Sequence, residues 1–184
     1  MDTSKIKVSN KKYGKIVERQ LINTFIIDIL IIIVVIVLFA GFRVCVSTEI
    51  VRGTSMEPTL YNSDKLLSIH PKITGIHRGN IAIIKTSEAE HGLIVKRVIA
   101  VPGDTIEIMD TDVILNGGYL EEDYINSMPG GEYYPERKLG DGEYFVLGDN
   151  RGNSSDSRDD AIGIINKDDI IYISVYDMTQ KKRL

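Results

Sequence analysis

The chain has 184 residues, enough for one domain with a hydrophobic core in addition to a membrane anchor, whereas two independent domains would be crowded. It carries a net charge of −4 and one cysteine, Cys45, which excludes an intramolecular disulfide and metal ligation by a set of cysteines. The charge is unevenly distributed. Residues 1–20 hold six lysines and arginines against two acidic residues, so this segment carries +4 and the remainder −8.

Residues 21–42 form an almost uninterrupted run of Leu, Ile, Val, Phe and Ala. As a helix this run would extend about 33 Å, which is enough to cross the hydrocarbon core of a bilayer. A cleavable signal peptide would have a shorter apolar region and end at a small-residue site, which residues 42–46 do not offer. We therefore expect a retained, single transmembrane helix in the cell membrane.

The basic segment 1–20 predicts the orientation of this helix. Under the positive-inside rule, residues 1–20 form a cytoplasmic tail and residues 43–184 form an extracytoplasmic domain. A basic arm that binds nucleic acid is the alternative interpretation of residues 1–20.

Beyond residue 60 the sequence changes to short runs rich in β-branched residues, separated by Gly, Pro, Asn and Asp. The predicted strands are residues 65–69, 81–85, 93–101, 105–109, 113–115, 143–147 and 170–176. Ile106 and Ile108 alternate with polar residues, as in a strand with one buried face. Asn116-Gly117-Gly118 is typical of a tight hairpin. These signals predict an all-β domain, a compact antiparallel sheet behind the single helix.

Two polar segments have no clear helix or strand pattern. Residues 119–142 are acidic and contain Pro129, Gly130 and Gly131, which predicts a surface excursion, with a lid over a substrate as the alternative. The basic residues 181–183 predict a solvated segment, or a contact with anionic lipid headgroups.

Ser55 lies between Gly53 and Pro58, directly after the apolar part of the chain. A serine hydroxyl is a weak nucleophile unless a base about 2.6–3.2 Å away takes its proton. Lys96 lies inside the apolar run 93–99, where burial can turn an amine into such a base. A lysine in this setting can also be a surface residue with a buried stem. The three histidines lie in no comparable setting: His70, His77 and His91.

Three blocks of the sequence resemble bacterial type I signal peptidases in their order and spacing. The blocks are Ser-Met-Glu-Pro-Thr-Leu at 55–60, Lys-Arg-Val-Ile at 96–99 with Pro-Gly-Asp at 102–104, and Gly-Asp-Asn-Arg at 148–151 with Ser154 and Asp-Ser-Arg at 156–158. The resemblance implies a membrane-bound serine endopeptidase that removes signal peptides from secreted preproteins after small residues of the Ala-X-Ala type. It implies Ser55 as nucleophile, Lys96 as general base, and no cofactor or metal.

The same resemblance implies roles for further residues. Ser154 would orient the Lys96 amine, and Met56 would lie near the membrane-facing rim. The residues of a shallow pocket for small side chains would be Val51, Leu60 and Val95. The residues of a structural charge network would be Asp149, Arg151, Asp156 and Arg158. Enterobacterial members carry a serine at the position of Gly53, and its hydroxyl serves as the second donor of the oxyanion hole. Because this chain has glycine there, the resemblance does not say which group is the second oxyanion donor.

Metal binding and two rival functions can be weighed on the sequence. Residues 148–160 are rich in Asp and Asn, but Arg151 and Gly152 interrupt the spacing of a calcium loop. The expected partners are preprotein signal peptides and membrane lipid, without nucleic acid, and the expected state is a monomer. A self-cleaving Ser/Lys repressor-like peptidase would carry a helix-turn-helix where this chain has an apolar run. A non-catalytic, membrane-tethered β module would need neither Ser55 nor Lys96.

Overall fold

The computed structural model describes residues 3–89, 91–125 and 129–184. It separates a helical unit, Met1–Val44, from a β unit, Cys45–Leu184. The predicted basic tail and the predicted excursion 119–142 therefore lie partly outside the described residues.

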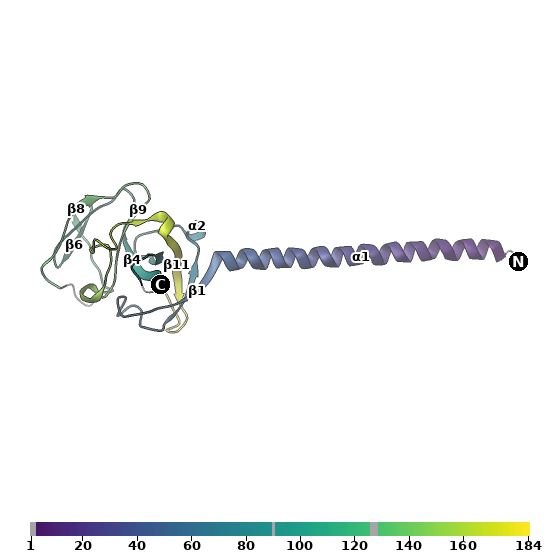
Figure 1. Ribbon diagram of the computed structural model, residues 1–184, viewed down its shortest axis with the longest axis horizontal. Coiled ribbons are helices and arrows are strands. Elements are labelled where there is room, and N and C mark those ends of the chain that lie inside the picture. Colours follow the sequence, from purple (N-terminus) through teal and green to yellow (C-terminus); the bar gives the residue numbers. More distant parts are fainter. Residues whose placement is uncertain (1–2, 90, 126–128) are drawn as a thin grey trace. The chain divides into compact units, whose positions relative to one another are not determined.

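Helix α1 comprises Thr3–Cys45 (Figure 1). Its section Arg19–Cys45 is long and apolar enough to cross a membrane, and apolar side chains such as Leu30 and Leu38 are exposed around it. A helix that is apolar all round is stable in lipid rather than in water. The helix begins well before residue 21 and ends three residues after 42, so the change at residue 20 is one of composition and not of backbone structure.

The β unit is built, in its described residues, from two antiparallel sheets (Figure 1). The first has the order β1-β2-β11-β3-β4-β9-β10 with β12 paired to β11, and the second has the order β7-β6-β5-β8. The bounds are β1 Val46–Ile50, β2 Lys65–Ile69, β3 Ile81–Lys85, β4 Leu93–Ala100, β5 Thr105–Asp110, β6 Asp112–Leu115, β7 Gly118–Tyr119, β8 Glu132–Lys138, β9 Glu143–Leu147, β10 Ile165–Asn166, β11 Ile170–Asp177 and β12 Lys182–Arg183. The short helices are α2 Pro71–Thr74 and two 3-10 turns, Arg151–Asn153 and Lys167–Asp169.

The prediction of an all-β domain is confirmed. The seven predicted strands correspond to β2, β3, β4, β5, β6, β9 and β11, and each end differs by at most one residue. The predicted hairpin is also present: Asn116 and Gly117 have positive φ angles, and Leu115 pairs with Gly118 across them.

Two segments that were not predicted as strands contain strands. Strand β8 lies within the excursion 119–142 and pairs with β5, and β12 lies within the segment predicted to be solvated and pairs with β11. The predicted loop character is therefore wrong at β8, whereas Lys181 and Arg183 are exposed as a solvated segment requires. The side chains of β8 are mostly exposed at a sheet edge, and the strand contains Pro135, so its sequence has the polar character of a loop.

The buried apolar side chains form three clusters. One joins the two sheets through residues such as Ile106 and Phe145, and a second lies against β3, β9 and β11. The third, which we call the loop core, consists of Val51, Met56, Leu60, Leu66 and Ile81, with Val95 and Leu184 packed against it. Three members of the loop core belong to residues 51–60, so this cluster supports the segment that carries Ser55.

Candidate active site

Ser55 lies on a loop of residues 51–64, which we call the nucleophile loop. The ends of this loop are joined because the backbone N–H of Val51 donates to the carbonyl of Asp64 at 2.8 Å. The loop is also held beside the nucleophile, where the Asn150 backbone N–H donates to the Ser55 carbonyl at 3.0 Å. The position of Ser55 is therefore fixed both from the base of the loop and from residues 148–153.

Lys96 reaches the nucleophile from strand β4. In the register of β3 and β4 it lies opposite Ala82, whose small side chain leaves room for the lysine stem. The Lys96 Nζ lies 2.7 Å from the Ser55 Oγ, a distance that allows direct proton transfer. The structure thus brings the predicted nucleophile and the predicted base together, although 41 positions separate them in the sequence.

The Lys96 side chain is buried, and the residue is 3% exposed. Burial lowers the pKa of Lys96 from 10.5 to about 8. The positive charge of Arg158 also lowers this pKa, whereas the Asp156 carboxylate raises it. Below pH 8 the folded protein must keep a charged ammonium group in this buried site, so Lys96 lowers the stability there. That cost falls as the pH rises from 8 to about 10.5, where the unfolded chain also loses the proton.

Ser154 lies next to the dyad, across Gly148. A Cβ atom built on Gly148 would lie 2.5 Å from the Ser55 carbonyl oxygen and 2.6 Å from the Ser154 Cβ, closer than atoms pack. The Ser154 Oγ is buried and has no hydrogen-bond partner among the described residues, Lys96 included. A buried hydroxyl without a partner is costly, so this group is available for a hydrogen bond when the site rearranges.

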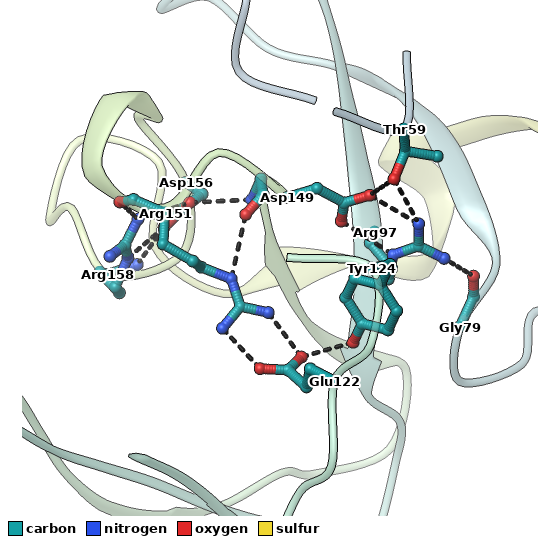
Figure 2. Close-up of polar contacts among 10 residues, drawn as sticks. Thr59, Gly79, Arg97, Glu122, Tyr124, Asp149, Arg151, Asp156 and Arg158 are labelled. Atoms are coloured by element: carbon teal, nitrogen blue, oxygen red, sulfur yellow. Dashed lines mark hydrogen bonds and ion pairs between the residues drawn. The ribbon is translucent and has the colours of Figure 1, made fainter. Parts of the chain in front are cut away.

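The four residues predicted to form a charge network each take part in a short ion pair (Figure 2). The pairs are Arg97 with Asp149, Arg151 with Glu122, and Arg158 with Asp156, at N–O distances of 2.6, 2.5 and 2.8 Å. All three are largely shielded from solvent. Breaking one partner of such a buried pair typically costs about 3–5 kcal/mol, because an uncompensated charge remains.

Two of these pairs fix the backbone of Gly148. The Gly148 N–H donates to Asp156 at 3.0 Å, and the Arg151 Nε donates to the Gly148 carbonyl at 3.0 Å. Arg158 in turn donates to the Arg151 carbonyl at 2.8 Å. The arginines therefore hold the glycine that packs against Ser55 and Ser154.

The third pair fixes the nucleophile loop. Asp149 accepts a hydrogen bond from the Thr59 hydroxyl at 2.5 Å and two from the guanidinium group of Arg97. Arg97 also donates to the Gly79 carbonyl at 2.9 Å. Arg97 follows Lys96 on β4 and points to the other face of the strand, so one strand supplies both the predicted base and a support for the loop.

Glu122 and Tyr124 were not predicted as site residues, yet they complete these pairs (Figure 2). Glu122 accepts hydrogen bonds from Arg151 and from the Tyr124 hydroxyl, and the Arg97 guanidinium carbon lies 3.9 Å from the centroid of the Tyr124 ring. Burial raises the pKa of Tyr124, and the Glu122 carboxylate raises it further. The first part of the excursion is thus attached to the site, and no local pattern in the sequence signals these long-range partners.

A cleft of about 620 Å³ opens beside the dyad, and both Ser55 and Lys96 line it. Its other walls include residues of β1, β4 and the 86–92 turn, with His91 among them. Of the three residues predicted to form the substrate pocket, Val95 lines this cleft, whereas Val51 and Leu60 are buried in the loop core. Met56, expected at a membrane-facing rim, is also buried there and is only 1% exposed.

The acidic residues near the site are engaged by arginines. Within residues 3–89, 91–125 and 129–184, no three His, Cys, Asp or Glu side chains lie together in a way that could hold a metal ion. Asp149 and Asp156, which suggest a calcium loop by composition, each accept two or more hydrogen bonds from arginine side chains.

Gly53 has a φ angle of +84°, a conformation that favours glycine. Its N–H donates to the Asn62 side chain at 3.0 Å, and a Cβ built on it would meet no atom within 4 Å. A side chain at position 53 therefore has space, but the backbone would be strained.

We expect Gly53→Ser to lower the stability by about 1 kcal/mol, because a serine in a left-handed conformation is strained. The added hydroxyl can act as an oxyanion donor, and a well-aligned donor is worth about 3 kcal/mol, or about a hundredfold in kcat. Gly53→Ala is the matched control, since it has the same strain and no hydroxyl. Peptide-cleavage kinetics should give the serine variant a kcat at least tenfold above that of the alanine variant. Equal values would exclude a donor role at position 53.

A serine hydroxyl against a buried amine, on a β domain that follows an apolar helix, is the arrangement of a membrane-anchored serine hydrolase with a lysine base. A sequence model of the family described as "Signal peptidase, peptidase S26" matches residues 22–175. The chain belongs to this signal peptidase family.

Relatives with established names agree with this assignment. The chain is 37% identical over 153 residues to signal peptidase I P of Bacillus subtilis subsp. natto, covering 77% of this chain and 81% of the relative. It is 34% identical over 177 residues to signal peptidase I U of Bacillus subtilis strain 168, covering 88% and 90%. A crystal structure of a signal peptidase I from Enterococcus faecalis V583 is 29% identical, with a TM-score of 0.42, and covers 51% of this chain and 92% of that one. The protein is a membrane-anchored serine endopeptidase that removes signal peptides.

Proposed function

We propose that Ser55 is the nucleophile of this signal peptidase and that Lys96 is its general base. The observation that carries the proposal is the 2.7 Å distance between the Ser55 Oγ and the Lys96 Nζ, at the wall of a cleft. The burial that lowers the pKa of Lys96 to about 8 supports the same role, because only the neutral amine can accept the serine proton.

The reaction is an acyl transfer in two steps. Neutral Lys96 takes the proton of the Ser55 hydroxyl while Ser55 Oγ attacks the scissile carbonyl, and the resulting ammonium group protonates the leaving amine as the peptide bond breaks. Lys96 then takes a proton from water, which attacks the acyl ester, and the ammonium group returns this proton to the Ser55 oxygen as the ester bond breaks and the signal peptide is released. The backbone N–H of Ser55 is one donor to the developing oxyanion.

Ser154 orients the Lys96 amine in this mechanism. Its hydroxyl is buried beside the dyad and is without a partner among the described residues, and Gly148 is packed between it and Ser55. A flexible lysine needs such a group to keep its amine aligned with the nucleophile. Asp149, Arg151, Asp156 and Arg158 act as structural residues through their ion pairs.

The substrate lies extended in the cleft and is cut after small residues of the Ala-X-Ala type. Strand β1 is at the edge of the first sheet and lines the cleft, so its free backbone groups can pair with an extended peptide. Val51 and Leu60 are already packed in the loop core, which leaves little depth beneath Ser55 for a large side chain.

The enzyme is a single-pass protein of the cell membrane, with residues 1–20 cytoplasmic and the β domain outside. The +4 charge of residues 1–20 supports this orientation. Protease added to right-side-out cells should degrade the β domain and spare an epitope placed before residue 20. Protection of the β domain together with loss of the epitope would reverse the proposed orientation.

Ser55→Ala should reduce cleavage of a fluorogenic Ala-X-Ala peptide in detergent by about 10⁴-fold or more, since no nucleophile remains. Ser87→Ala is the matched control, because Ser87 is an exposed serine on the 86–92 turn, and it should keep wild-type activity. Cleavage by Ser55→Ala at the wild-type rate would remove Ser55 from the mechanism, and absence of cleavage by the wild type itself would favour the non-catalytic β module. A self-cleaving repressor is disfavoured by the family match and by the apolar helix.

A further inference from the structure

We propose that a hairpin of residues 177–184 positions the nucleophile loop for catalysis, with Lys182 as the positioning residue. Lys182 is half-buried, and its Nζ donates a hydrogen bond of 2.6 Å to the carbonyl oxygen of Thr59. The Gln180 side-chain amide approaches the same oxygen at 3.4 Å. Thr59 lies four residues after Ser55, so the hairpin contacts the loop close to the proposed nucleophile.

The hairpin holds the nucleophile loop at two further places. The Gln180 side chain donates to the Asp64 carboxylate at 2.6 Å, and Asp64 closes the base of the loop. Leu184 packs against the loop core, to which Val51 and Met56 belong. The loop is therefore engaged at its base, through its core, and at Thr59.

The hairpin is itself rigidly attached to the sheet, so it can hold another segment in place. The buried carboxylate of Asp177 accepts hydrogen bonds from the backbone N–H groups of Thr179 and Gln180 at 2.8 and 3.0 Å. The backbone N–H of Lys65 in β2 donates to the Thr179 hydroxyl at 2.9 Å, and the Lys65 carbonyl accepts from the Met178 N–H at 2.7 Å. These bonds tie the turn to β2 as well as to β11.

Thr59 connects the nucleophile loop to two other parts of the β unit. Its hydroxyl donates to Asp149 on one side, and its carbonyl accepts from Lys182 on the other. A backbone hydrogen bond of 2.9 Å from Leu60 to Met56 links this point to the residue next to Ser55. A displacement of Thr59 is thus passed to the Ser55 hydroxyl, and a shift of about 1 Å in a reacting group can cost a hundredfold in rate.

The test compares Lys182→Met, which keeps the apolar stem but removes the donor, with Lys181→Met, which removes the same charge from the exposed neighbouring residue. We expect Lys182→Met to lower kcat about tenfold, with KM within twofold and an unchanged thermal transition. The loosened loop should also let water reach Lys96, so the apparent pKa in the pH profile of kcat/KM rises above 8. Lys181→Met should match the wild type, and Lys182→Arg should recover most of the activity because it restores a donor.

If Lys182 is purely structural, Lys182→Met will lower the thermal transition and leave kcat and the pH profile of the folded fraction unchanged. This result would overturn the proposal. If Lys182→Met does not fold, Gln180→Ala decides, because Gln180 is exposed and still contacts Thr59 and Asp64. We expect a threefold lower kcat for Gln180→Ala, and a wild-type kcat would overturn the proposal.

The inference rests on Ser55 as nucleophile. Activity near the wild-type level in Ser55→Ala would refute that role, whereas full activity in Lys182→Met with an inactive Ser55→Ala refutes the hairpin alone.

Discussion

Lys96→Arg is expected to be as inactive as Lys96→Ala, with a loss of about 10⁴-fold or more in kcat/KM. Arginine keeps the positive charge and most of the stem length, but its guanidinium group stays protonated at any accessible pH and cannot accept the Ser55 proton. A lysine that served only in an ion pair would instead be replaced well by arginine. The measurement is peptide cleavage by both variants beside the wild type.

The pH dependence of the wild type gives an independent test of the same role. Because burial lowers the pKa of Lys96 to about 8, kcat/KM should rise with pH through a single apparent pKa near 8 and then level off. The variant Lys96→Met should be inactive, with a thermal transition at pH 7 no lower than that of the wild type, since the cost of a buried charge is removed. Substantial cleavage by Lys96→Arg would direct the search to His91, which lines the cleft, rather than to His70 or His77.

Gly148→Ala should cause a loss of at least a hundredfold in kcat/KM. The new Cβ would lie 2.5 Å from the Ser55 carbonyl oxygen, so the backbone of the nucleophile has to move. The crowding should also lower the stability by about 1–3 kcal/mol. Gly118→Ala is the matched control, because the nearest atom to its Cβ would lie 3.8 Å away, and this variant should be fully active.

A double variant separates the two consequences of this crowding. Ser154→Gly removes the side chain that would clash with the new Cβ at position 148 and leaves the contact with the Ser55 carbonyl. In Gly148→Ala with Ser154→Gly, thermal unfolding should recover part of the lost stability, while cleavage stays low. Recovery of full activity in the double variant would show that Gly148 matters through Ser154 rather than through the position of Ser55.

The strands that the sequence predicted are those with strong apolar patterns. Strands β3, β4 and β9 are buried along most of their length, so their runs of Ile, Val and Leu are unambiguous. Strand β1 follows α1 without a break, and its five residues could not be separated from the end of the apolar run. Strands β8 and β12 are exposed or very short, and their pairing with β5 and β11 is fixed by tertiary contacts.

The candidate site shows the same contrast between residues that lie in a local sequence pattern and residues whose place is fixed by tertiary contacts. Ser55 and Lys96 could be named because each lies in a local pattern, a glycine and proline turn or an apolar run, that also forms part of the blocks resembling signal peptidases. Glu122, Tyr124 and Thr59 have no such pattern, since their importance comes from partners far along the chain. Val51 and Leu60 were predicted as pocket residues, but their side chains are buried in the loop core and do not line the cleft.

The wide sequence separation of these contacts has a consequence for when the enzyme becomes active. Ser55 and Lys96 are 41 positions apart, Thr59 and Asp149 are 90 apart, and Thr59 and Lys182 are 123 apart. Contacts of such long range form late in folding, because large loops must close first. A nascent chain that has emerged as far as residue 140 contains both dyad residues and none of the groups at 148–154 or 177–184 that hold them. If Ser55 and Lys96 form the catalytic pair, we expect proteolytic activity to arise only after the whole β domain is synthesised and folded.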